Sequence, residues 1–412
     1  MSIEDNIENF LFLLKDYEED SINAEHLTIL QCKVIDLLKS INKLVKTNFK
    51  NYSPLLSLLY CGLIGNYIYS KSLSNDSINE ELILLSNNIS EVSKLSIKEW
   101  LSETKYQNKT LCSKLIEIIT NSIKNKSLSK MFLHRDAGLW LTFQLNYPII
   151  NDYSPGLLPL ALNAADSYIK RIAIIGIKAL IHIAQNSYKA QLRYYGQADL
   201  IYETLKKNVY TQDLDILNAI FPCLLEFLKS FNPPPCESVS CFSEFSFANG
   251  YDELLRFLLQ DLYICSNQER KIILISHLNR MIDLMGFSLM KFMKQYLKSL
   301  ETILLAPEIR NSYPIVKEMM LENLLHCLKF IKPITKFIVV DFVKIFMAFV
   351  DESFEFLSEK KDFSEIVNLT VKVLKIFSEE NKILISKIYK EVEDVIVNKD
   401  NFKIFVVNAI ID

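Results

Sequence analysis

The sequence predicts an all-α protein built as a helical-repeat solenoid, and three observations lead to this prediction. Glycine and proline are scarce, with 8 and 11 copies in 412 residues, so the chain lacks the turns of a large β structure and the glycine loops that hold phosphates. Apolar residues recur at the i, i+3, i+4, i+7 spacing of a helix face in one segment after another. The third observation is the regular distance between successive helices.

The first part of the chain, residues 1–150, is predicted to be an irregular N-terminal helical region. Its apolar positions follow the helical period, but the intervals between the segments are uneven and are rich in Asn and Ser. Residues 151–155 are the expected boundary with the rest of the chain. The helices expected in this region span roughly residues 3–16, 24–46, 53–70, 78–93, 109–124 and 129–146.

Residues 151–412 are predicted to form a regular solenoid. The helix at 169–184 is apolar on more than one side, as an inner helix of a stack would be. If the helices beginning near residues 169, 214, 272, 315 and 364 are second members of pairs, their spacings are roughly 45, 58, 43 and 49 residues. Pair repeats of the HEAT or armadillo type run at about 40–47 residues. The one long interval contains residues 232–250, a stretch rich in Pro and Ser that we expect to be an inserted loop.

Charge and cysteine content exclude several classes of protein. Lys and Arg number 46 against 49 Asp and Glu, a net charge of -3, so the concentrated basic surface of a nucleic-acid-binding protein is not expected. The longest apolar stretches, 172–184 and 338–350, are too short and too charged to span a bilayer, and the acidic N-terminus does not resemble a secretory signal. The 8 scattered cysteines favour a reducing compartment. We therefore expect no nucleic acid and no membrane among the partners.

No arrangement of residues typical of catalysis is found. Four of the five histidines lie inside amphipathic helices without a ligand or base at a useful spacing, and nucleophile elbows, P-loops and dinucleotide fingerprints are absent. Cys236 and Cys241 are the one close cysteine pair, and a structural zinc site there is the weaker of two interpretations because no second pair or histidine accompanies them. We expect a protein that is not an enzyme and has no cofactor or metal.

The turn from Arg193 to Asp199 allows two interpretations. In the structural one, Gly196 permits the chain to reverse and the neighbouring tyrosines wedge between helices. In the functional one, Arg193 with Tyr194, Tyr195 and Asp199 forms a partner-binding site, since Tyr and Arg dominate binding energies at interfaces.

The same part of the chain resembles a known family. From Leu157 to Tyr210, a short apolar helix leads to Asp166 and the basic pair Lys170 and Arg171, then to a buried helix and the run LRYYG, residues 192–196. This resembles the family of the second Tel-two-interacting protein, the smallest subunit of the Triple T complex. The likeness continues more weakly to about residue 380 and is diffuse over residues 1–150. Family members often have an acidic pair at positions 165 and 166 and Arg at position 197, where this chain has Ala-Asp and Gln.

The resemblance implies a non-catalytic adaptor with a HEAT-like fold. Its implied partners are Tel-two-interacting protein one and the Tel-two protein, and indirectly the ninety-kilodalton heat-shock chaperone machinery and the phosphatidylinositol-3-kinase-related kinases whose maturation the complex supports. The implied location is the cytoplasm, with the nucleus as a second compartment. Two alternatives stay open: another HEAT-type binding module, such as a transport receptor or a scaffold, and a HEAT-like DNA glycosylase, which would need a basic groove with an acidic catalytic residue.

Overall fold

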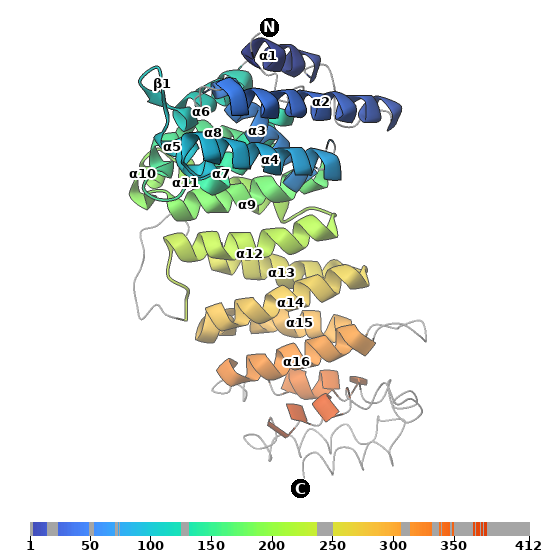
Figure 1. Cartoon of the computed structure of the whole chain (residues 1–412). Helices are drawn as coiled ribbons and strands as arrows, with labels where there is room; N and C mark the ends of the chain where they lie inside the picture. Colours follow the sequence, from blue (N-terminus) through green and yellow to red (C-terminus); the bar gives the residue numbers. More distant parts are fainter. Residues whose placement is uncertain are drawn as a thin grey trace. The chain divides into compact units, whose positions relative to one another are not determined.

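A computed structural model shows a chain of helices (Figure 1). It describes residues 3–14, 24–48, 53–70, 73, 75–124, 132–236, 250–305 and 314–331, and helical residues at several positions between 338 and 376. The chain forms two compact units, Met1–Ser230 and Phe231–Asp412. Within the described residues, the one departure from helix and loop is a two-stranded hairpin.

The first unit contains all six helices predicted before residue 150, together with a short helix and a hairpin that were not predicted. The unpredicted helix is α5, and the hairpin is formed by β1 and β2. The elements are α1 (Ile3–Leu14), α2 (Ala24–Asn48), α3 (Pro54–Gly65), the π-helix η1 (Asn66–Ser70), α4 (Asp76–Ser93), α5 (Ile97–Glu103), β1 (Lys105–Tyr106), β2 (Lys109–Thr110), α6 (Leu111–Lys124), α7 (Phe132–Gln144), α8 (Ile150–Ala165), α9 (Lys170–Asn186), α10 (Lys189–Tyr194), α11 (Gln197–Asn208) and α12 (Leu214–Phe231).

Glycines set the closest helix crossings in this unit. The main pairs are α2 with α4, α3 with α7 and α8 with α9. A Cβ at Gly65 of α3 would lie 2.3 Å from the carbonyl oxygen of Asp136 on α7, and one at Gly176 of α9 would lie 2.2 Å from the backbone nitrogen of Ala165 on α8. Because no larger side chain fits there, the backbones approach closely, and apolar neighbours such as Leu63 and Ile177 are buried.

The second unit is built from helical hairpins in the same way. Its described elements are α13 (Gly250–Ile264), α14 (Gln268–Met285), the 3-10 helix η3 (Gly286–Phe292), α15 (Met293–Leu304) and α16 (Pro314–Ile331). The α15 helix lies alongside α13, and Ser299 Oγ of α15 donates to the Leu259 carbonyl of α13 at 2.8 Å. Buried Tyr296 donates to Asn323 Oδ1 at 2.8 Å and so joins α15 to α16. These stacked pairs confirm the predicted all-α helical-repeat solenoid of the HEAT type.

One stretch of the described residues, Gln268–Leu304, is long and apolar enough to cross a membrane by length and composition alone. Half of its most apolar window is buried inside the protein. The stretch is also divided at Gly286, whose positive φ of 50° ends α14 before the chain continues into η3 and α15. Its apolar side chains, such as Leu274, Leu278 and Leu300, are core residues of the second unit.

The boundary between the two compact units does not lie where the sequence analysis expected a domain boundary. Residues 151–155 lie inside α8, which packs against α6 and α7 as well as against α9, whereas the compact units divide after Ser230. Sequence period alone does not show this, because it detects a helix and not which neighbours cover it. Of the expected loop at 232–250, residues 232–236 are non-helical beyond the end of α12, α13 begins at Gly250, and 237–249 lie outside the described residues. Residues 377–412 of the predicted solenoid also lie outside them.

Candidate protein-interaction site

The four predicted site residues lie together where α10 turns into α11. Tyr194 ends α10 and is 84% exposed, and Tyr195 follows it at 64% exposure. Their ring centroids are 5.1 Å apart, and the rings meet edge to face at 82°. Arg193 is half-buried, and Asp199 is exposed in the first turn of α11, where the positive end of the helix dipole favours a carboxylate.

A glycine and two buried anchors fix this corner. Gly196 has a φ of 64° and reverses the chain, as the sequence predicted, and no atom lies within 4 Å of a Cβ built there. Leu192 before the turn and Ile201 after it are buried, 1% and 0% exposed. The helix ends are therefore held by the core while the aromatic rings extend outward, which gives an aromatic surface whose position is set before a partner arrives.

The interpretation in which the tyrosines wedge between helices is wrong, because both rings face outward. Their side chains contribute little to the core at these exposures, so the residues are left for recognition or for solvent. A partner-binding role for Arg193, Tyr194, Tyr195 and Asp199 stays a prediction.

Three more exposed apolar residues belong to neighbouring corners of the first unit. Tyr147 and Ile149, in the connection from α7 to α8, are 63% and 49% exposed, and Tyr188 before α10 is 58% exposed. The backbone N–H of Tyr188 donates to Asn151 Oδ1 at 2.7 Å, which ties the α9–α10 corner to the start of α8. The helical period did not predict that these residues are exposed. The signal in the sequence was that each is a large apolar residue at the end of a helix, outside its periodic apolar face.

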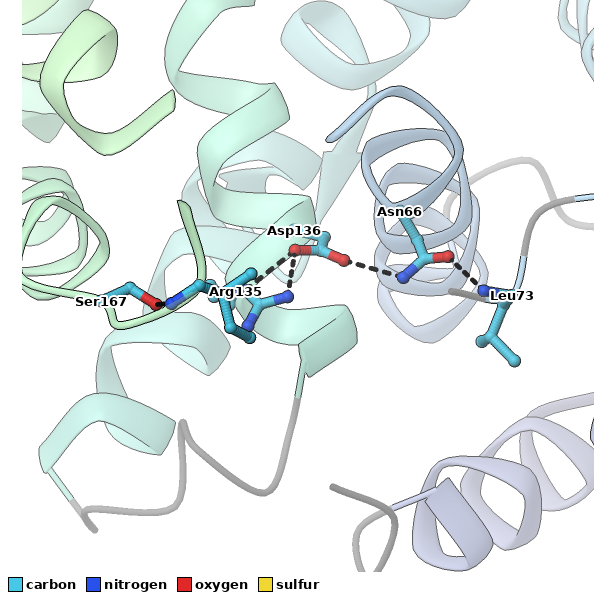
Figure 2. Close-up of polar contacts among 6 residues, drawn as sticks. Asn66, Leu73, Arg135, Asp136 and Ser167 are labelled. Carbon is cyan, nitrogen blue, oxygen red and sulfur yellow. Dashed lines mark hydrogen bonds and ion pairs between the residues drawn. The ribbon is translucent and has the colours of Figure 1, made fainter. Parts of the chain in front are cut away.

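A buried polar network on α7 was also not predicted (Figure 2). The Asp136 carboxylate, which is fully buried, accepts hydrogen bonds from Arg135 Nε at 3.0 Å and from Asn66 Nδ2 at 3.1 Å. Asn66 Oδ1 in turn accepts from the Leu73 N–H at 2.8 Å. The network joins α7 to η1 and to the connection after η1. Because the polar groups of this network form hydrogen bonds with one another, we assign it a structural role in holding these elements together.

The histidines and cysteines of the described regions show no catalytic arrangement. Burial lowers the pKa of His134 to about 4, and burial together with Arg280 lowers the pKa of His277 to about 4, so both are neutral at pH 7. Burial raises the pKa of the Cys112 thiol to about 12, which leaves it protonated. Within the described part of the chain, no three His, Cys, Asp or Glu side chains gather as metal ligands do. Cys241, one of the two suggested zinc ligands, lies outside it.

The described helices define the chain as a helical-repeat protein. Comparison with known proteins gives a partial likeness: TELO2-interacting protein 2 of Homo sapiens and that of Mus musculus are each 29% identical over 87 residues. The match spans 21% of this chain and 17% of each of those proteins. The chain matches no model of a known protein family.

Two solved structures are similar over nearly the whole chain, at low identity. An engineered protein covers 99% of this chain at 11% identity with a TM-score of 0.40. Importin beta covers 97% of this chain, with 53% of its own chain, at 10% identity and a TM-score of 0.39. The fold assignment rests on the helices themselves.

Proposed function

We propose that the chain is a non-catalytic adaptor subunit of a complex of the Triple T type, supporting the chaperone-dependent maturation of phosphatidylinositol-3-kinase-related kinases. The observation that carries this proposal is the 29% identity over 87 residues to TELO2-interacting protein 2, a protein named for its partner. Stacked helical pairs suit such a role because they offer extended surfaces for other proteins. The proposed partners are counterparts of the Tel-two protein and of Tel-two-interacting protein one, met in the cytoplasm and the nucleus.

The proposed contact surface is the α10–α11 corner. Tyr194 and Tyr195 present large, rigid side chains that lose little conformational entropy on binding, with Arg193 and Asp199 beside them. Truncation of an interface anchor of this kind costs about 2 kcal/mol or more in binding, which is roughly a thirtyfold loss of affinity.

The test is purification of the tagged full-length chain from cells that express it, with the copurifying proteins identified by mass spectrometry. The proposal expects the two partner counterparts in near-stoichiometric amounts. Tyr195→Ala is expected to reduce their recovery while helicity and the melting temperature stay nearly unchanged, and Tyr210→Ala, at the same 64% exposure, is the matched control. Recovery of import cargoes or of an unrelated complex instead would refute the Triple T assignment.

A further inference from the structure

A small cavity opens at the same end of α7 as Tyr147 and Ile149, within the first unit. It encloses about 250 Å³. Its buried wall is apolar and comes from three elements: Leu101 of α5, Cys112 of α6, and Leu141 with Leu145 at the end of α7. Tyr147 and Ile149 also line it and are exposed, so large apolar side chains continue from the cavity onto the surface.

The size and chemistry of the cavity favour protein recognition over a cofactor site. Pockets for drug-sized ligands and cofactors have about 300–1,000 Å³, so this cavity holds one or two amino-acid side chains. The Cys112 thiol, protonated at neutral pH, supplies no nucleophile. What the walls offer is burial of apolar surface, worth roughly 25 cal/mol for each Å² removed from water.

Local hydrogen bonds hold the walls in place. At α5, Ser96 and Glu99 form a capping box in which Glu99 Oε2 accepts from the Ser96 N–H at 2.9 Å. At the end of α7, His182 Nε2 donates to the Leu145 carbonyl at 2.8 Å. Thr110 Oγ1 lies 3.3 Å from the Tyr153 hydroxyl, which links the β1–β2 hairpin to α8. A cavity with fixed walls costs little to organise when a ligand binds.

The charged residues that line the cavity are Lys98 and Glu99. The Glu99 carboxylate is already engaged by Ser96, through the backbone N–H and through Oγ at 2.7 Å. Lys98 is exposed and makes no ion pair with any residue the structure describes. A carboxylate is the group that would complement it.

We infer that this cavity is a docking site for a partner segment in which bulky aliphatic side chains stand next to acidic residues. An aliphatic side chain enters the cavity between Leu101, Leu141 and Leu145, a second lies on Tyr147 and Ile149, and a carboxylate pairs with Lys98. The inference rests on the proposed function only in taking the chain to bind other proteins, and it does not depend on which complex the chain belongs to.

The test uses the full-length chain and two fluorescein-labelled hexapeptides as probes in an anisotropy titration. In one peptide two adjacent leucines are flanked by glutamates, and in the other they are flanked by lysines. The acidic peptide is expected to bind about fivefold more tightly, the value of one exposed charge pair. Lys98→Glu is expected to reverse this preference, and Lys39→Glu, an exposed lysine of α2 that does not line the cavity, is expected to leave it unchanged.

The apolar contact is tested with a second matched pair. Ile149→Asn is expected to weaken the acidic peptide at least about tenfold, or 1.4 kcal/mol, while Leu200→Asn, at the same 49% exposure on α11, has no effect. Failure of both peptides to bind, equal binding of the two, or full binding by folded Ile149→Asn would each overturn the docking site. None of these results would alter the copurification experiment, so the two proposals can fail separately.

Discussion

Asp136 provides the sharpest test of how the first unit is held together. Replacing it by Asn keeps the shape of the side chain and removes its charge. The new carbonyl can still accept from Asn66 Nδ2, but the new amide N–H groups then face the donors of Arg135, which lie 2.9 and 3.0 Å from the present carboxylate oxygen. Asp136→Asn therefore turns a charge-assisted contact into two opposed donors.

The expected cost is about 3 kcal/mol of unfolding free energy. Breaking a buried ion pair by removing one partner costs about 3–5 kcal/mol. We expect the lower end of this range. The Arg135 side chain is 14% exposed and can turn partly toward water, whereas the Asp136 side chain is 0% exposed. For a unit of this size, 3 kcal/mol corresponds to a decrease of roughly 6–12 °C in melting temperature.

Tryptophan fluorescence during urea unfolding is the appropriate assay, because the chain has 2 tryptophans. Trp100 and Trp140 both lie in the first unit, so their signal reports the unit that contains Asp136. The control is the double variant Arg135→Met with Asp136→Asn, which removes both charges. It should recover about 2 kcal/mol of the loss, since paired charges can be replaced together at little cost. A loss below about 1 kcal/mol for Asp136→Asn, or strict additivity in the double variant, would refute the reasoning.

Two further predictions concern stability. Because the pKa of His134 is about 4 in the folded chain and 6.5 for an unperturbed histidine, its contribution is intact above pH 6.5 and is lost as the pH falls toward 4, by about 2 kcal/mol at pH 5. His134→Leu should flatten the urea midpoint of the tryptophan signal between pH 6.5 and 5, and an unchanged slope would contradict this origin. Gly176→Ala should lower the unfolding free energy by about 3 kcal/mol, because its Cβ meets the backbone of Ala165 at 2.2 Å. Gly196→Ala should lower it by only about 1 kcal/mol, the strain of an alanine at a φ of 64°, because nothing lies within 4 Å of its Cβ. Equal costs in thermal unfolding would show that the close crossing is not the cause.

The helical period predicts elements better than it predicts their packing. It located the six helices before residue 150, because each carries an apolar face long enough to repeat. It missed α5, since a helix of 7 residues repeats its face barely twice, although the Ser96 and Glu99 capping box was a readable signal. The hairpin has two-residue strands and depends on positive φ at Gln107 and Asn108, which no alternation pattern announces.

Long-range partners could not be read from the sequence. Asn66 and Asp136 are separated by 70 positions, and their contact exists because Gly62 and Gly65 let α3 approach α7. The candidate site could be predicted from the sequence in part. Tyr and Arg beside a glycine indicated a recognition corner, but whether the rings pointed outward depended on Leu192 and Ile201 filling the core beneath them, which is a property of the packed unit.

The α11–α12 corner, at the end of α11 and beside the start of α9, is the alternative site for partner binding, because Tyr168 and Tyr210 are also exposed there. Both of its lysines Lys170 and Lys207, however, are already paired within the chain: Lys207 contacts Asp166 at 3.1 Å, and Lys170 pairs with Asp213 and Asp215. A partner with its own charges would compete with these pairs, whereas Asp199 at the α10–α11 corner has no ion pair within the described residues. If Tyr210→Ala reduced partner recovery and Tyr195→Ala did not, the interaction site would have to be placed at the α11–α12 corner despite this electrostatic argument.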